Sequence, residues 1–182
     1  MTSDQAKFLL HFLLPQLSSE RSVTSRILLA VPSGAEEYRP HPLSRSAFAL
    51  AWHIVAAEMW LLDAVIYQRF GEFQARLSEI KTCQDVAHWY DQQFTIRFPL
   101  IEALSGEALA TQVNYFDLRN DPAVAYLNIA IRHSVHHRGQ LSAYLRPMGA
   151  KVPAIYVESG DEPYPPEPGT PAAKNPQPPP AF

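Results

Sequence analysis

The sequence predicts an all-α protein folded as a four-helix bundle. Four long segments repeat apolar residues at the three- and four-residue spacing of a helix. Residues that commonly start or stop helices stand at the ends of these segments. The chain of 182 residues, 47% of them hydrophobic, can bury one core and is too short for two ordinary domains. The expected helices cover residues 2–30, 44–70, 82–101 and 121–146.

The first helical segment opens with Thr2 and Gln5 at the spacing of a capping box, in which each side chain accepts a hydrogen bond from the other residue's backbone. Pro15 should break or kink this helix, because proline lacks the N–H that the helical ladder needs. The apolar residues are spaced as one buried stripe. They are Phe8, Leu9, Phe12, Leu13, Leu17, Val23, Ile27 and Leu28.

The second segment, residues 44–70, contains one histidine. His53 shares a helical face with residues that are mostly apolar, so this face should point inward. The other members of the face are Ser46, Leu50, Ala57, Trp60 and Ala64. Taken alone, a histidine on such a face is more often a hydrogen-bonded core residue than a metal ligand.

The third helix should begin at Thr82, because Asp85 follows three residues later and completes a capping box. Cys83 in its first turn is interpreted as a small core residue, and a thiolate nucleophile is the alternative. Residues 105–120 should form a long connection whose stretch 112–117 is extended.

The fourth segment is a well-marked helix. Asp121 is a good N-cap, and Pro122 suits the first helical position because its missing N–H would be unpaired there anyway. Pro147 and Gly149 should stop the helix. Gly139 lies inside it, where glycine costs about 1 kcal/mol relative to alanine, and should make room for close helix packing.

Two histidines on this helix have the spacing of a metal-binding pair. At about 100° per residue, His133 and His137 lie about 40° apart, so both rings can approach one ion at about 2.0 to 2.1 Å. The metalloprotease version has glutamate after the first histidine; Ser134 stands there, which excludes that chemistry. His136 lies off this column, and Arg138 points away from it toward a salt bridge or an anionic group at the opening. The alternative is a surface or hydrogen-bonded core pair.

A metal site needs further ligands, and His53 supplies a third imidazole on another helix. Helix bundles build metal sites from inward side chains on facing helices, and three ligands with an open fourth position are the catalytic arrangement. The predicted metal ligands are therefore His53, His133 and His137. The catalytic candidates are His136, Gln140 and Glu58. Gln140 projects between the histidine pair and is the preferred hydrogen-bond donor.

Two stretches also carry a family resemblance: RPHPLSRSAFALAWHIVAAE at 39–58 and HSVHHRGQLSAYLRPMGAKVPAIY at 133–156. They resemble the DinB family, the DinB/YfiT-like metalloenzymes, over most of residues 10–162. The most specific part is H-x-x-x-H-R-G-Q, followed by Y-L-R and a G-x-x-V-P turn. The resemblance implies an up-down-down-up or similar bundle and a divalent ion held by His53, His133 and His137. The chain departs from the family pattern at 156–162, where relatives tend to have Tyr-Gly before Ser-x-Asp-Glu.

The resemblance further implies a chemistry that uses Zn²⁺, Ni²⁺, Fe²⁺ or Mn²⁺. Characterised relatives include transferases that use low-molecular-weight thiols such as bacillithiol, and a mycothiol-dependent isomerase. This implies transfer of, or onto, a small thiol. One alternative is a metal-dependent hydrolase in which His136 or Glu58 relays protons. Another is a non-catalytic, stress-associated metal-binding bundle that acts as a dimer.

Composition restricts the partners and the compartment. The formal charge is −3 with no Lys/Arg cluster, which argues against nucleic acid, since phosphate binding needs a basic face. The single cysteine fits a reducing compartment. Charged residues interrupt the longest apolar stretch, and Asp4 stands where a signal peptide would be positive. We therefore expect a cytoplasmic protein that binds a small molecule rather than a membrane, and that forms a homodimer.

The expected domain organisation is a bundle over residues 1–158 followed by a tail over residues 159–182. From Pro163 onward, 9 of the 20 residues are proline, so this stretch cannot pack a core and should be extended or disordered. Just before it, residues 152–157 should form a short strand or a loop packed on the bundle.

Overall fold

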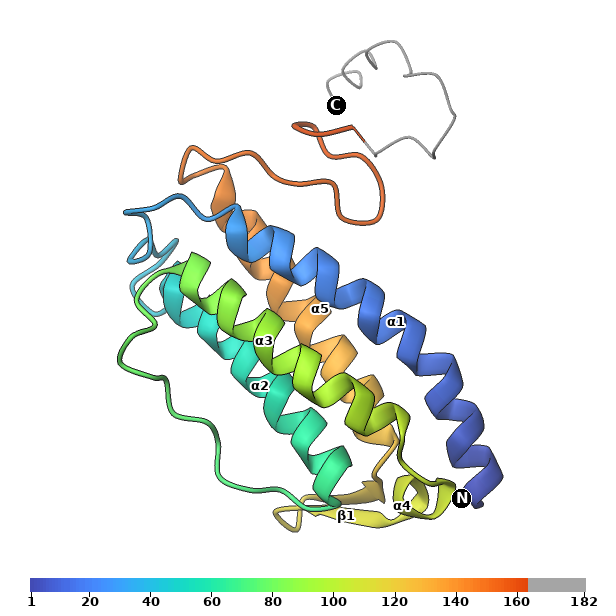
Figure 1. Cartoon of the computed structure of the whole chain (residues 1–182). Helices are drawn as coiled ribbons and strands as arrows, with labels where there is room; N and C mark the ends of the chain where they lie inside the picture. Colours follow the sequence, from blue (N-terminus) through green and yellow to red (C-terminus); the bar gives the residue numbers. More distant parts are fainter. Residues whose placement is uncertain (164–182) are drawn as a thin grey trace.

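A computed structural model describes residues 1–163 of the chain (Figure 1). Four long helices run side by side as a bundle, which confirms the predicted fold class. They are α1 (Ser3–Leu29), α2 (Ala47–Tyr67), α3 (Cys83–Glu102) and α5 (Ala125–Leu145). A short helix, α4 (Gly106–Ala110), and an antiparallel hairpin of β1 (Gln112–Tyr115) and β2 (Arg119–Pro122) connect α3 to α5. They lie at the end of the bundle where the chain begins (Figure 1).

Helix α1 begins as predicted, and the predicted break at Pro15 is absent. The side chains and backbones of Thr2 and Gln5 form the reciprocal capping box. Pro15 does not break the helix, which is continuous from Ser3 to Leu29. Pro15 lies on the exposed side, whereas Leu14 and Leu17 beside it are buried. Burial of the apolar stripe outweighs the cost of about 3 kcal/mol that an interior proline carries.

Two members of the predicted stripe of α1 are exposed, and Leu9 and Val23 are only partly buried. Phe8 is 70% exposed and Phe12 is 61% exposed. The buried face consists instead of Ala6, Leu10, Leu13, Leu14, Leu17, Thr24, Ile27 and Leu28. Apolar residues occupy more than one face of this helix, so their spacing alone could not separate the face that meets the bundle from the face that meets solvent.

The prediction that the fourth helix starts at Asp121 is wrong. Asp121 and Pro122 belong to β2, and α5 begins at Ala125 without a side-chain cap. The Asp121 carboxylate pairs with Arg119 instead of capping a helix. The next residue after the strand, Ala123, donates its N–H to the carbonyl that precedes β1. These contacts hold the chain in an extended conformation until the helix can start.

Helix α2 is the most apolar of the four long helices. By length and composition it could cross a membrane, with a mean hydropathy of 1.5, and 67% of that stretch is buried inside the protein. It packs against α3 and α5. Such burial is typical of a bundle helix whose apolar surface is covered by neighbouring helices.

The chain after α5 folds back as a loop and contains no strand within residues 152–157. Gly149, in the left-handed region at φ 77°, marks the end of the helix as predicted. Contacts with the bundle continue beyond residue 158: Glu162 pairs with Arg26 at 2.9 Å, and Asp161 pairs with Arg146 at 3.0 Å. The rest of the predicted tail, residues 164–182, lies outside the described residues.

Candidate metal centre and adjoining cavity

The histidines singled out in the sequence meet at the contact between α2 and α5. His53 comes from α2, and His133 and His137 come from α5. The ring centroids are 4.9 Å apart for His53 and His133, 4.6 Å for His53 and His137, and 4.4 Å for His133 and His137. One ring nitrogen from each residue lies within 4.8 Å of the other two, and all three side chains are partly buried.

The backbone explains why these rings converge. His133 and His137 are one helical turn apart on the side of α5 that faces α2. On α2, His53 is followed one turn later by Ala57, a small residue that lines the space beside the rings. The close packing of the two helices then brings imidazoles that are 80 or more positions apart in sequence into contact.

The spacing of the nitrogens fits a shared divalent ion. Two nitrogens about 2.0 to 2.1 Å from one tetrahedral ion lie roughly 3.4 Å apart. The Nε2 atoms of His53 and His137 are 3.2 Å apart. The Nδ1 atom of His133 is buried and has no hydrogen-bond partner in residues 1–163. Because a buried polar atom without a partner is costly, an incomplete set of this kind suits a ligand that completes it.

The surroundings keep these imidazoles neutral, which is the form that binds metal. Burial lowers the pKa of His53 to about 4, and the nearby positive charge of Arg45 acts in the same direction. Burial also lowers the pKa of His133 to about 4, helped by the neighbouring histidines. The pKa of His137 is lowered mainly by burial, although its hydrogen bond with Gln140 opposes this change.

Gln140 holds one of the candidate ligands in position. With its Nδ1 protonated, His137 donates to Gln140 Oε1 over 2.8 Å, which leaves His137 Nε2 free to face His53. The amide nitrogen of Gln140 lies 3.3 Å from Nε2 of His136, an exposed residue whose ring is 4.8 Å from that of His137. Gln140 and His136 therefore adjoin the cluster on its solvent side, where a hydrogen bond fixes the tautomer of His137.

Glu58 takes a different place from the other catalytic candidates. It is 2% exposed, and its carboxylate accepts hydrogen bonds from Tyr90 over 2.7 Å and from Ser134. Burial raises its pKa to about 7. Through these two hydrogen bonds Glu58 of α2 links α3 and α5 in the interior. It does not line the cavity beside the histidines.

Of the two residues that follow His137 on α5, Arg138 stabilises the fold and Gly139 does not have its predicted role. Arg138 points away from the histidines and is buried, and its guanidinium pairs with Glu20 of α1 and hydrogen-bonds the Tyr156 hydroxyl. The predicted salt bridge is therefore present. The prediction that Gly139 makes room for close packing is wrong, because a Cβ atom placed there would meet nothing within 4 Å.

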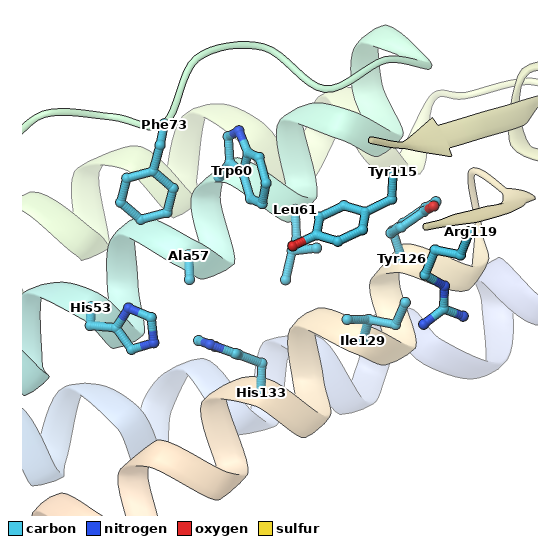
Figure 2. A pocket seen from close by; sticks show the side chains of 10 residues that line it. All are labelled: His53, Ala57, Trp60, Leu61, Phe73, Tyr115, Arg119, Tyr126, Ile129 and His133. Carbon is cyan, nitrogen blue, oxygen red and sulfur yellow. The ribbon is translucent and has the colours of Figure 1, made fainter. Parts of the chain in front are cut away.

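A cavity of about 480 Å³ opens beside the histidines (Figure 2). His53 and His133 lie at one end, and Arg119 lies at the other end near Ile129. Aromatic side chains from α2, α5, the hairpin and the loop after α2 line the space between them. The lining residues are His53, Ala57, Trp60, Leu61, Phe73, Tyr115, Arg119, Tyr126, Ile129 and His133.

Sequence reasoning missed the part of this cavity wall that the hairpin supplies. Trp60 stands on the predicted inward face of His53, so its place could be read from helical spacing. Tyr115 and Arg119 come from the hairpin, a stretch that the sequence predicts only as a connection. The only local signal for it was the extended stretch at 112–117, which did not reveal a partner strand.

The lone cysteine is not part of this site. Cys83 is fully buried, and burial raises the pKa of its thiol to about 12. The thiol therefore stays protonated at neutral pH, which rules out the thiolate alternative and leaves a small core residue.

Comparisons with known proteins agree with this fold. The sequence profile of the DinB family matches residues 3–167. The protein named "Uncharacterized protein YjoA" of Bacillus subtilis (strain 168) is 27% identical over 141 residues, which cover 76% of this chain and 87% of YjoA.

Two crystal structures of DinB-like proteins superpose on the bundle. That of YjoA from Bacillus subtilis has a TM-score of 0.66 at 24% identity and covers 79% of this chain and 96% of YjoA. That of a DinB-like protein from Bacillus cereus ATCC 10987 has a TM-score of 0.67 at 25% identity and covers 79% of this chain and 95% of its own.

Proposed function

The chain belongs to the DinB family, and on that premise we propose that it is a divalent-metal-dependent enzyme. The proposed ligands are His53, His133 and His137. The observation that carries the proposal is the convergence of three partly buried imidazoles from two helices. Zinc, nickel, iron(II) and manganese(II) are the candidate ions, since imidazole ligands alone do not select among them.

The cluster adjoins a cavity, which favours catalysis over a structural metal site. Three protein ligands leave a position for substrate or water, and two of the three histidines line the cavity. A divalent ion bound there would act as a Lewis acid and lower the pKa of a thiol or water that reaches it. The chain's own residues orient His137 through Gln140 and surround the ligand with aromatic side chains.

As the reaction, we propose transfer of, or onto, a low-molecular-weight thiol. The chain has one cysteine, and Cys83 is buried with a thiol pKa of about 12. A thiol-dependent reaction must therefore take its sulfur from a bound small molecule. The cavity volume of about 480 Å³ lies within the usual range for a small-molecule site.

Metal-assisted hydrolysis is the second candidate. Its supporting observation is the contact of exposed His136 with Gln140, which in turn contacts His137. In this role the His136 imidazole would itself exchange a proton with a water molecule beside the cluster, and the Gln140 amide would orient the His136 and His137 rings without carrying the proton. A purely non-catalytic bundle is less well supported, because the cavity leads to the histidines.

The proposed setting is the cytoplasm, with a second copy of the chain as partner and neither nucleic acid nor membrane. Two helices that pack together each expose a pair of large apolar residues four positions apart: Phe8 and Phe12 on α1, and Ile96 and Leu100 on α3. Exposed apolar side chains of this kind favour association. Light scattering on the native chain and on Phe12→Glu should show a dimer that the variant weakens; an unassociated native chain would contradict the proposal.

Titration of the cobalt(II)-loaded protein with a small thiol tests the reaction class. Cobalt(II) accepts the same ligands as zinc, and its visible spectrum responds to the atoms around it. The thiol-transfer proposal expects a sulfur-to-cobalt charge-transfer band in the native protein and none in His137→Ala. Full cobalt binding without a thiol-dependent band, together with ester hydrolysis, would favour the hydrolase.

A further inference from the structure

The cavity beside the histidines is polar at its two ends and aromatic between them. His53 and His133 form one end, and Arg119 of β2 forms the other (Figure 2). We propose that the cavity binds a ligand with a flat apolar body and a terminal carboxylate, and that Arg119 binds that carboxylate. The carboxylate site at Arg119 does not depend on a bound metal. Only the part that His53 and His133 would play toward the ligand rests on the proposed function.

Arg119 has hydrogen-bonding capacity to spare. A guanidinium carries five N–H donors, and its Nε donates to Asp121. The four donors on the two terminal nitrogens have no acceptor among residues 1–163. Two parallel N–H groups match the two oxygens of a carboxylate, which is why arginine is preferred for this group. The hydrogen bond to Asp121 thus fixes the guanidinium through Nε and leaves the N–H groups of its two terminal nitrogens available.

The charge of the wall also suits an anion. Arg119 is the only Lys, Arg, Asp or Glu residue among those that line the cavity. Its counter-charge, Asp121, is not among them. Within residues 1–163 the lining therefore contributes one positive charge and no carboxylate, while the Asp121 carboxylate lies outside the lining and contacts Arg119 through Nε.

The middle of the cavity is lined by aromatic rings, and most of their polar atoms already form hydrogen bonds to the backbone. The Trp60 indole N–H donates to the Gly71 carbonyl over 2.8 Å, and the Tyr126 hydroxyl donates to the Val113 carbonyl over 2.9 Å. Tyr115 packs edge-on against Trp60 with 6.0 Å between ring centroids. These rings offer apolar faces, so they suit the flat body of a ligand.

The Tyr115 hydroxyl is the exception in this wall. Figure 2 shows it directed from the hairpin into the cavity, toward the histidine end. It has no hydrogen bond to another residue in the described part of the chain. A ligand anchored at Arg119 would pass this hydroxyl before it reaches the histidines, so one further polar group along the ligand could be bound there.

Calorimetric titration of the full chain, freed of metal with a chelator, tests the proposal. The probes are 2-naphthylacetate and its neutral isostere 2-naphthylacetamide. The native protein should bind the acid at least about tenfold more tightly than the amide, because a hydrogen-bonded charge is lost in the amide. Arg119→Met should remove this preference by weakening acid binding at least about tenfold, with a much smaller effect on amide binding. The matched control is Arg132→Met, which removes an exposed arginine beside His133 that does not line the cavity.

Three results would overturn the proposal: equal affinity for acid and amide, a preference that survives Arg119→Met, or no binding of the acid at millimolar concentration. Far-ultraviolet circular dichroism should match across the variants, since the Arg119 side chain is 47% exposed. The titrations use metal-free protein, so the carboxylate cannot bind a metal ion instead of Arg119. For the same reason, a failure of the metal proposal would leave this test valid.

Discussion

Helix α5 carries two pairs of polar residues that are offset by one position and have opposite surroundings. His133 and His137 face His53 of α2, and His133 also lines the cavity, while Ser134 and Arg138 are buried on the other side. Ser134 hydrogen-bonds Glu58, and Arg138 pairs with Glu20. The protein's own atoms satisfy the second pair, whereas the first pair keeps a buried nitrogen without a partner in residues 1–163.

The difference separates a structural network from a binding site. Polar groups that are buried and fully hydrogen-bonded hold helices together, and removing one partner leaves the other unsatisfied. Groups that are half-buried, neutral and short of a partner can accept a ligand with little rearrangement. We therefore expect substitutions at Ser134, Arg138 and Glu58 to change stability, and substitutions at the histidines and Gln140 to change binding.

The largest stability effect is expected for Arg138→Met. The substitution removes a buried guanidinium that joins α5 to α1 through Glu20. Loss of one partner of a buried ion pair costs about 3 to 5 kcal/mol. Urea denaturation should show this loss, while the folded variant should bind metal like the native chain. His137→Ala should lose metal binding and keep most of its stability. Equal losses of stability in the two variants would contradict the division into a structural network and a binding site.

Glu58 should give stability a pH dependence of about 3 kcal/mol. Its ordinary pKa of 4.5 applies to the unfolded chain, and burial raises the pKa in the folded chain to about 7. The folded state keeps the proton to higher pH, so this contribution is fully present below pH 4.5 and is lost as the pH rises through about 7.

The comparison with Glu58→Gln isolates this contribution, because the amide does not titrate and can still accept the hydrogen bond from Tyr90. The free energy of unfolding of the native chain, relative to Glu58→Gln, should decrease between about pH 4.5 and 7 on metal-free protein. If the difference in free energy of unfolding between the native chain and Glu58→Gln stays constant with pH, then Glu58 has the same pKa in the folded and the unfolded chain.

Gln140→Leu should weaken metal binding by about 10- to 100-fold without unfolding the protein. The side chain is exposed, and it fixes the orientation of His137 through a 2.8 Å hydrogen bond. Loss of an outer partner of a metal-binding histidine typically has an effect of this size. Gln140→Glu should restore the acceptor and most of the affinity. Unchanged affinity in Gln140→Leu would show that the hydrogen bond does not support the site.

The smallest effect is expected for Gly139→Ala, which should raise the free energy of unfolding by about 0.5 to 1 kcal/mol. Gly139 lies in a helix interior, on the exposed side, with nothing within 4 Å of an added Cβ. Thermal denaturation should show a small rise in Tm and metal binding should be unchanged. A loss of stability would mean that the helix needs glycine at this position after all.

Features that depend on a few neighbouring residues could be predicted from the sequence. The capping boxes at Thr2 and Thr82 are local hydrogen-bond patterns, and both are present. The face shared by His133 and His137 follows from helical spacing alone. The inward direction of His53 follows from the apolar residues of α2. These features were enough to bring the three candidate ligands to one place.

Features that depend on distant partners could not be predicted in this way. Asp121 is an equally good residue for a helix cap and for a pair with Arg119 in a hairpin, and only the pairing of β1 with β2 decides between them. Phe8 and Phe12 have the spacing of a buried face, yet α1 buries its neighbouring face. The cavity wall combines residues from several elements, so no single segment reveals it.

Elemental analysis of the untagged protein tests the central claim most directly. The native chain, His53→Ala, His137→Ala and a control, His88→Ala on the exposed side of α3, would be reconstituted with zinc, nickel or manganese and freed of excess metal. We expect near-stoichiometric metal in the native chain and the control, and loss of metal in the two site variants. Full retention of metal by His53→Ala, or no metal in the native chain with any of the three ions, would contradict the account.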